Sequence, residues 1–194
     1  QKMGGSPFDF LIKTPDEKIK KVFKGFKNRF TTGNDISAML AGVKKVIKRY
    51  GSLGECFIKN VEKTDATYIP AISRFVSEIN IAGNAFLLPQ PEMGSAFIRL
   101  NLYLRWMIRR DDVDPGGWSD LSAAKLIIPL DTHMFWIGKK LGFTKRKQAN
   151  LKTAVEITEA FSKFSPDDPV KYDFALTRFG IRKDMASALS KKFF

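Results

Sequence analysis

The chain has 194 residues, of which 44% are hydrophobic and 12% aromatic, so it can bury a core and is not a disordered protein. Its 33 Lys and Arg residues outnumber 20 Asp and Glu residues, which leaves a formal net charge of +13. The single cysteine, Cys56, excludes an intrachain disulfide framework and a cysteine-ligated zinc or iron–sulfur site.

The charge and the N-terminal residues indicate a partner and a location. The surplus of +13 favours nucleic acid or another polyanion, because cationic side chains neutralise phosphates and release counterions. Alternatively, the lysines only keep the protein in solution. The longest apolar stretch, Phe97 to Ile108, is interrupted by charged residues, and Gln1 to Pro7 is no signal peptide, so we expect a cytoplasmic protein. The sequence does not begin with Met, and we expect an N-terminally truncated chain.

Helical patterns follow one another in the first half of the chain. The run Thr14-Pro15-Asp16-Glu17 predicts a capping box, with Pro at the first helical position. Apolar stripes predict the helix that follows it and two more helices, from Asp35 to Tyr50 and from Pro70 to Asn80. Gly51 is predicted to end the second of these helices.

The second half continues the helical pattern. A turn-rich segment, Leu88 to Ser95, precedes the most apolar predicted helix, Ser95 to Arg110, and Asp111 to Ser119 is predicted to be a loop. The remaining predicted helices are Asp131 to about Gly142, Lys147 to Phe164, Pro169 to Phe179 and a short last one with Met185 and Leu189 inward. The pattern predicts a single compact all-α domain over residues 1–194, a two-lobed bundle of about seven or eight short helices.

One acidic residue, Asp131, stands where the segment Ile128-Pro129-Leu130 meets a predicted helix. Asp is a preferred N-cap residue, so a purely structural interpretation has its carboxylate accept a hydrogen bond from the Met134 amide. The functional interpretation places the same carboxylate at the mouth of a cleft, kept ionised by the helix dipole. There it can stabilise a developing cation or activate water.

Two basic features suggest phosphate binding. A turn at Gly94 and Ser95 exposes backbone amides before a helix, as phosphate sites do, although most such pairs are only caps. A run of cations without an acidic residue follows the Asp131 helix and forms either a phosphate track or an ordinary solvated helix end. Its members are Lys139, Lys140, Lys145, Arg146, Lys147 and Lys152.

Three polar residues lie one helical turn apart on the apolar Ser95–Arg110 helix: Asn101, Arg105 and Arg109. Buried charges and amides need partners, because leaving them unpaired is costly. The two arginines therefore either face DNA or form a structural ion-pair network with the Asp111–Asp114 loop or Asp173. Phe135 and Trp136 could stack on a base, but such residues are more often core, and His133 is more often structural than a proton carrier.

Several motifs in this order resemble an uncharacterised bacterial family, domain of unknown function 2400. They are Gly94-Ser95-Ala96, Arg99-Leu100-Asn101, Leu104-Arg105-Trp106-Met107, Ile128-Pro129-Leu130-Asp131 and the segment from Asp168 to Leu176. The proline-containing turn before Gly94 and the segment Leu130-Asp131-Thr132-His133 also resemble the helix-hairpin-helix DNA glycosylase superfamily, which includes the relatives of endonuclease III.

The resemblance implies a fold and a site. Residues 86–142 would hold the hairpin and the Asp-bearing helix, and Asp131 would be the catalytic aspartate, which stabilises positive charge on the deoxyribose as a flipped base departs. The hairpin differs from the superfamily form, since it is longer and lacks the first glycine. The residues after it, Ser95 to Arg99, contain no lysine, so a Schiff-base lyase step is not expected.

The sequence therefore predicts a monomeric DNA-repair protein that binds damaged double-stranded DNA, with neither metal nor cofactor. Its expected activity is monofunctional hydrolysis of the N-glycosidic bond of a damaged base, with Asp131 as the catalytic residue. A non-catalytic nucleic-acid-binding helical protein on the same scaffold is the alternative, and a module that binds an acidic protein is a third possibility. The predicted nucleic-acid contacts are Gly94, Ser95, Arg99, Arg105, Arg109, Lys139, Lys140, Lys145, Arg146 and Lys147.

Overall fold

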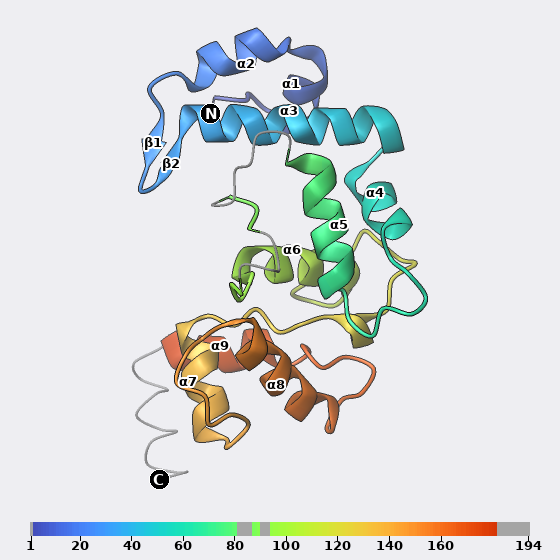
Figure 1. The fold of residues 1–194 in the computed structure, drawn as a ribbon, viewed down its shortest axis with the longest axis vertical. Helices are drawn as coiled ribbons and strands as arrows, with labels where there is room; N and C mark the ends of the chain where they lie inside the picture. The colour runs from blue at the N-terminus through green and yellow to red at the C-terminus, as the bar shows by residue number, and fades with distance from the viewer. Residues whose placement is uncertain (1, 81–86, 90–93, 182–194) are drawn as a thin grey trace. The chain divides into compact units, whose positions relative to one another are not determined.

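The computed structural model describes residues 2–80, 87–89 and 94–181. The chain divides into two compact units: an N-terminal unit, Gln1–Lys63 with Pro70–Gln90, and a C-terminal unit, Thr64–Ile69 with Pro91–Phe194. Apart from a two-stranded hairpin, the regular structure of the described residues is helical (Figure 1), which confirms the predicted all-α class. The predicted site region, residues 86–142, is divided between the two units.

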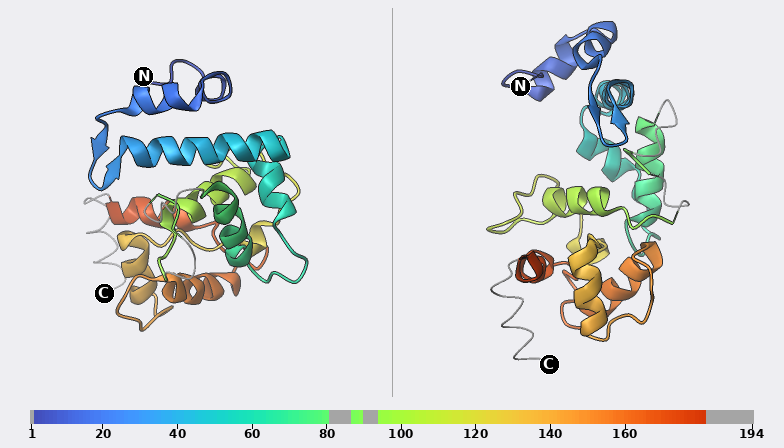
Figure 2. Two further views of the ribbon diagram at one scale, coloured as in Figure 1. Left: turned by 45° about the horizontal axis from the view of Figure 1, so that its top comes forward. Right: turned by 90° about the vertical axis from the view of Figure 1, so that its left-hand side faces the viewer.

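The N-terminal unit contains two short helices, a hairpin, one long helix and two further helices. Their bounds are α1 Pro7–Lys13, α2 Asp16–Phe23, β1 Lys27–Asn28, β2 Thr31–Thr32, α3 Gly33–Tyr50, α4 Leu53–Lys59 and α5 Ile69–Ile79. Helix α2 packs along α3 (Figures 1 and 2). Leu11 of α1 and Ile19 and Phe23 of α2 form a buried cluster against which apolar side chains of α3 pack. Burying each such side chain stabilises the fold by about 1.5–3 kcal/mol.

The predicted capping box at Thr14 is wrong. Thr14 is the C-cap of α1, a helix that the sequence pattern did not predict, and its amide donates to the carbonyl of Phe10. Glu17 pairs with Lys20 at 2.8 Å, and Pro15 is the N-cap of α2 without a side-chain hydrogen bond. The reciprocal capping box lies instead at the start of α3, between Thr32 and Asp35.

The long helix and the helix after it agree with the sequence pattern. Helix α3 begins two residues before the predicted Asp35 and ends at Gly51, whose φ of 87° lies in the region that glycine favours. Helix α5 buries Ile72, Phe75, Val76 and Ile79, as its apolar stripe predicts. Helix α4 was not predicted, because its seven residues are too short for a clear periodic pattern.

The C-terminal unit contains four α-helices in its described residues and one 3-10 turn, η2 Ala123–Lys125. The helices are α6 Ile98–Ile108, α7 Thr132–Lys140, α8 Leu151–Ser162 and α9 Asp173–Ile181. Helix α7 packs against α9. Helix α7 also packs against α8. A Cβ added at Gly138 of α7 would lie 2.5 Å from the Ile157 side chain of α8, so glycine allows the two helices to pack closely there.

Several helices of this unit begin later than the sequence pattern predicts. Helix α8 begins after Asn150, whose side chain accepts a hydrogen bond from the Thr153 amide and so acts as the N-cap. Helix α6 begins after Phe97, which takes a left-handed conformation with a φ of 49°. The predicted helix with Met185 and Leu189 lies outside the described residues. No helix in the described part of the chain is long and apolar enough to span a membrane.

Candidate functional site

Asp131 is the N-cap of α7, as the sequence predicts. Its Oδ1 atom accepts a hydrogen bond from the Met134 amide at 2.7 Å, and its backbone carbonyl accepts one from Phe135 at 2.9 Å. The side chain is half-buried, and Oδ2 makes no hydrogen bond with any described residue. The carboxylate is thus oriented by the helix through one oxygen, while its second oxygen is available to a ligand.

Arg105 is buried in the C-terminal unit. Its Nε and Nη2 atoms donate hydrogen bonds to both carboxylate oxygens of Asp114, at 2.9 to 3.2 Å, and its Nη1 donates to Asp173 at the start of α9. All three side chains are buried. A guanidinium that is surrounded by protein carboxylates in this way cannot reach a DNA phosphate.

Arg109 is engaged in the same network one turn later. Its Nε donates to both oxygens of Asp168, at 2.9 and 3.1 Å, and its Nη2 donates to Asp111 at 2.7 Å. Its Nη1 donates to Asp114. The ion-pair interpretation of Arg105 and Arg109 is therefore confirmed, and neither is a phosphate contact, because both guanidinium groups are buried and paired.

Asn101, the third polar residue of α6, is also buried but does not join the network. Its side-chain amide donates to the carbonyl of Ala96 at 3.1 Å, which lies in the turn before α6. Because Phe97 in this turn has a positive φ, the hydrogen bond holds an irregular backbone segment in place. Asn101 thus stabilises the turn that presents Gly94 and Ser95.

Asp173 is the one buried side chain in the described residues that keeps an oxygen, Oδ1, without a hydrogen-bond partner. Burial raises the pKa of Asp173 to about 6, against the opposing effect of Arg105, and the negative charges of Asp131 and Asp114 add to the rise. The carboxyl groups of Asp131 and Asp173 therefore interact electrostatically. The site has two acidic groups, one half-buried at the start of α7 and one buried at the start of α9.

The turn at Gly94 and Ser95 lies beside the start of α8. The Gly94 carbonyl accepts a hydrogen bond from the Leu151 amide at 3.2 Å, and both turn residues are exposed. This contact brings the turn next to the cationic segment that precedes α8, which the sequence alone could not show. Ser95 does not open a helix as predicted; its Oγ accepts a hydrogen bond from the Phe97 amide at 3.3 Å.

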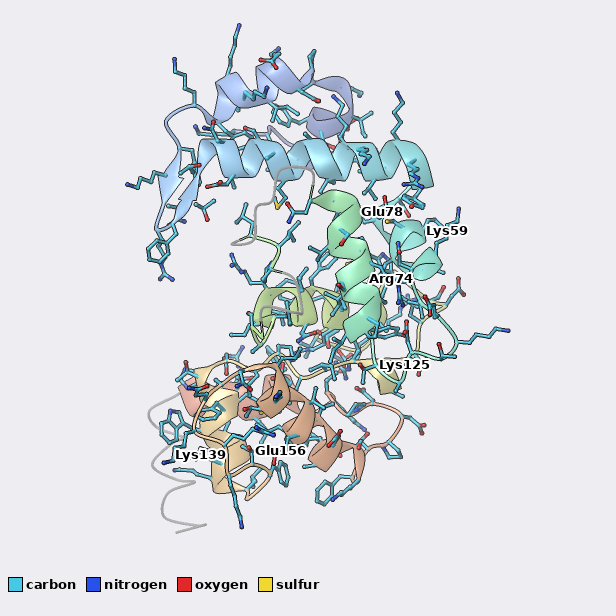
Figure 3. All side chains as sticks on the ribbon, viewed as in Figure 1. Lys59, Arg74, Glu78, Lys125, Lys139 and Glu156 are labelled. Atoms are coloured by element: carbon cyan, nitrogen blue, oxygen red, sulfur yellow. The ribbon has the colours of Figure 1, made fainter. Side chains whose placement is uncertain are left out.

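The predicted basic run lies on α7, on the segment between α7 and α8, and in the first turn of α8. Arg146 pairs with Glu156 of α8 at 2.9 Å, and Lys139 of α7 lies over the rings of Phe135 and Trp136 (Figure 3 labels Lys139 and Glu156). The other cations of the run are exposed: Lys140, Lys145, Lys147 and Lys152. The predicted contact Arg99, near the start of α6, is exposed as well. Arg146 is partly neutralised by its pair, so the other cations carry more of the positive charge.

The exposed side of α7 carries a residue whose position was predicted wrongly. Phe135 is core, as expected, but Trp136 is 54% exposed, although the sequence favoured a buried position for it. The side chain of His133 is also exposed, one turn before it. The helix turns Phe135 inward and its neighbour outward, because adjacent helical residues lie about 100° apart. The signal that could have found Trp136 is its i, i+4 spacing from Thr132 and Lys140 on a polar face.

A groove of about 510 Å³ runs along α8 in the same unit. Arg146, Leu151, Lys152 and Glu159 are among the residues that line it, and Asp131 is not. Asp131 thus lies at the half-exposed start of α7 rather than in this groove. The Asp131 carboxylate, the exposed face of α7 and the Gly94–Ser95 turn with its neighbouring cations all belong to the C-terminal unit.

Comparison with protein families finds one match, to the model described as "Protein of unknown function (DUF2400)", over residues 1–182. The match covers nearly the whole chain and includes the N-terminal helices, which lie outside the motifs that carry the resemblance in the sequence. No curated protein and no solved structure matches the chain.

Proposed function

The chain belongs to the DUF2400 family, and within that family we propose that it is a DNA-repair glycosylase, which hydrolyses the N-glycosidic bond of a damaged base with Asp131 as its catalytic residue. The observation that carries the proposal is the geometry of Asp131. A helix amide holds one oxygen of its carboxylate, while the other oxygen has no partner among the described residues. A second acidic group, Asp173, lies within electrostatic range.

In the proposed reaction the bond between the base nitrogen and C1′ of the deoxyribose breaks, and its electron pair leaves with the base. Positive charge then develops at C1′, and the carboxylate of Asp131 stabilises it electrostatically. Water adds to C1′, and the proton that it loses passes to the departed base, which leaves an abasic site and the neutral free base. Asp173 increases the negative potential behind Asp131 when it is ionised, so it is a positioning residue in this proposal.

DNA would be held by two exposed features of the same unit as the carboxylate. The backbone of Gly94 and Ser95, together with Lys145, Lys147 and Lys152, would contact phosphates, whose neutralisation dominates affinity for DNA. Trp136, on the exposed side of α7, would stack on a base or brace the gap that a flipped base leaves. Arg105 and Arg109 have no part in this surface because they are buried.

The proposed activity is monofunctional. A lyase step needs an amine that forms a Schiff base with the sugar, and the residues from Ser95 to Arg99 contain no lysine. The cation at C1′ is therefore expected to be captured by water rather than by an amine of the protein. Borohydride, which traps such an intermediate, should leave no protein–DNA adduct.

The test uses duplexes with single oxidised, alkylated or deaminated bases, and it measures abasic sites as strand breaks after alkali. Wild-type protein should release at least one of these bases, and Asp131→Asn should lose the activity while it binds DNA as before, because Asn remains a good N-cap. Asp167→Asn removes the same charge from an exposed position of the same unit and should keep the activity. No release of any base by the wild-type protein would overturn the proposal.

The alternative function is nucleic-acid binding without chemistry, and one observation favours it. Asp131 is fully explained as a helix cap, since Asp is among the best N-cap residues. This alternative predicts binding that weakens as salt concentration rises, with no base release and with equal affinities for intact and damaged duplexes. Binding that does not change with salt would count against both functions.

A further inference from the structure

The N-terminal unit presents an aromatic residue at the tip of its hairpin. Strands β1 and β2 pair Asn28 with Thr31, so Arg29 and Phe30 form a two-residue loop between them. The ring of Phe30 is 79% exposed, the highest exposure of any large hydrophobic side chain in the described residues. Exposure of a large apolar ring is unfavourable in water, which points to a binding role for the tip.

The backbone of this tip is strained. Arg29 has a φ of 52°, a left-handed conformation that costs a residue with a side chain about 1 kcal/mol or more. A glycine at this position would fit the turn without strain. The chain instead has a cation beside the exposed ring, which is the combination that binds both a phosphate and a base.

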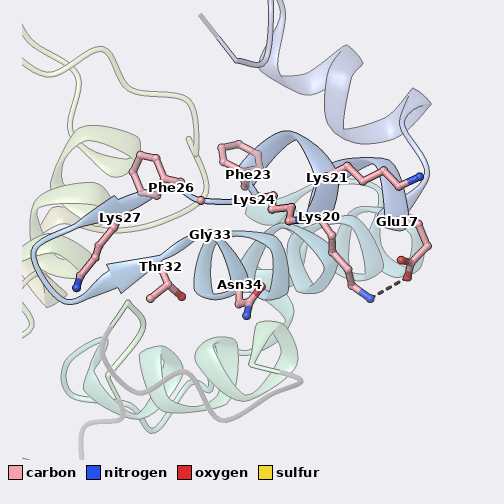
Figure 4. A pocket seen from close by; sticks show the side chains of 11 residues that line it. Glu17, Lys20, Lys21, Phe23, Lys24, Phe26, Lys27, Thr32, Gly33 and Asn34 are labelled. Atoms are coloured by element: carbon pink, nitrogen blue, oxygen red, sulfur yellow. Dashed lines mark hydrogen bonds and ion pairs between the residues drawn. The ribbon is translucent and has the colours of Figure 1, made fainter.

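A basic groove of about 620 Å³ lies beside the hairpin in the same unit. The end of α2, the hairpin and the first turn of α3 form its walls (Figure 4). Its charged lining residues are four lysines and one glutamate: Lys20, Lys21, Lys24, Lys27 and Glu17. Phe23 and Phe26 form the apolar part of the lining.

The acidic residues near the groove are already engaged. Glu17 pairs with Lys20 at 2.8 Å, Asp16 pairs with Lys44 at 2.9 Å, and Asp35 closes the capping box with Thr32. The remaining cations of the groove and the tip have no carboxylate partner in the described part of the chain: Lys21, Lys24, Lys27 and Arg29. The surface therefore carries an uncompensated positive charge that an anionic ligand would neutralise.

We propose that this groove and the Phe30 tip form a binding surface for single-stranded nucleic acid. Lys21, Lys24 and Lys27 contact successive phosphates, and Phe30 stacks on an unpaired base. Aromatic rings interleaved with cations bind single strands in this way, because every base has a face that stacks and every nucleotide has a phosphate. A single strand is favoured over a duplex because the ring needs a base that is not already stacked on both sides.

This surface is independent of the proposed base excision. It lies in the N-terminal unit, whereas Asp131 and its neighbours lie in the C-terminal unit. This surface would recognise its ligand through phosphate charge and base stacking, and this recognition needs no damaged base. The full chain can therefore bind single strands through this surface whether or not Asp131 is catalytic.

The experiment measures fluorescence anisotropy of a labelled thymidine oligonucleotide of about 12 residues, a length within the range that single-strand sites cover. Phe30→Ala should weaken binding about 5- to 100-fold, the loss expected when one stacked base is removed. Phe8→Ala removes a ring that is 60% exposed on α1 of the same unit, so it is the matched control and should bind as the wild type does.

The lysines are tested by the salt dependence of binding. The triple variant Lys21→Gln, Lys24→Gln, Lys27→Gln should reduce the slope of log affinity against log salt by about 2, since each single-strand phosphate contact contributes about 0.7. The matched triple variant replaces exposed lysines of the same unit outside the groove, Lys18, Lys45 and Lys48, and should leave the slope unchanged. Circular dichroism shows whether each variant is folded.

Further ligands distinguish the alternatives. An RNA oligonucleotide of the same length shows whether the surface prefers ribose or deoxyribose. Either preference supports the proposal if Phe30→Ala weakens binding of the preferred oligonucleotide. Binding to phosphatidylserine vesicles but not to the oligonucleotide would overturn the proposal. Wild-type affinity for the oligonucleotide in both Phe30→Ala and the triple variant of Lys21, Lys24 and Lys27 would also overturn it. Asp131→Asn should bind the oligonucleotide as the wild type does, so a failed base-release assay leaves this result unaffected.

Discussion

Arg105 of α6 and Asp114 of the loop that follows form a bidentate ion pair in which both side chains are buried, with hydrogen bonds of 2.9 to 3.2 Å. Asp173 and Arg109 extend the pair to the start of α9 and to the Asp111–Asp114 loop. The loop that follows α6 and the distant residues Asp168 and Asp173 are thus held in position by α6. Asp131 lies at the edge of this network, because its charge acts on Asp173.

Removal of the Arg105 guanidinium should destabilise the protein strongly. In Arg105→Gln the carboxylates of Asp114 and Asp173 lose their main partner while they remain buried, and breaking a buried pair on one side costs about 3–5 kcal/mol. Urea unfolding followed by circular dichroism measures the change. Arg110→Gln, at an exposed position next to the network, should cost much less. Equal losses in the two variants would contradict the structural role of Arg105.

The stability of the protein should depend on the proton of Asp173. Burial raises its pKa to about 6 from 3.8, so the folded protein binds a proton that the unfolded chain has released. This contribution to stability is complete below about pH 4 and is lost as the pH rises through about 6. Asp173→Asn removes the titration, so between pH 4 and 6 its melting temperature should change with a different slope from that of the wild type.

The comparison of slopes isolates Asp173 from the other acidic groups. Asp111 acts with the opposite sign, since hydrogen bonds from the backbone, above all from the Asp114 amide, lower its pKa. It contributes equally to wild type and variant. The exposed Asp167→Asn should show the wild-type slope. If the melting temperature of Asp173→Asn also changes with pH at the wild-type slope, Asp173 is not protonated in the folded protein at pH 5.

Trp136 should contribute to DNA binding and not to stability. Its ring is more than half exposed, so Trp136→Ala loses little packing, whereas loss of one stacking contact weakens binding about 5-fold or more. Fluorescence anisotropy of a labelled duplex that carries an abasic site measures the affinity. Trp106→Ala, which removes a 43% exposed ring from α6 of the same unit, is the control. Equal affinities of the two variants would exclude Trp136 from the DNA contact.

Gly42 should be intolerant of substitution even by alanine. A Cβ at this position of α3 would lie 1.9 Å from the carbonyl oxygen of Ile79 in α5, a backbone atom that cannot rotate away. Gly42→Ala should therefore destabilise the N-terminal unit by about 1–3 kcal/mol through overpacking. Helix propensity alone predicts that Gly42→Ala gains about 1 kcal/mol of stability. The sign of the change in the free energy of unfolding therefore shows which of the two effects dominates. Gly5→Ala, in open space, should be neutral in the same thermal unfolding assay.

Features that depend on a few neighbouring residues were predictable from the sequence. Asp131 caps α7 and Gly51 ends α3 because capping involves backbone groups within one helical turn. The apolar stripe of α5 also predicted its buried face. The false capping box at Thr14 shows the limit of such patterns, since Glu17 had a second partner in Lys20 one turn later.

The sequence by itself thus determined an all-α protein, its family motifs and the one carboxylate at the start of α7. Only the tertiary structure decided which charged groups face the solvent. Arg105 and Arg109 have the same chemistry as a DNA-binding pair, and they are internal because Asp114, Asp168 and Asp173 come to them from other segments. Burial and pairing depend on contacts between distant residues, and no local pattern encodes these contacts. For the same reason the net charge of +13 acquired a location only in the folded chain, on the exposed lysines of each unit.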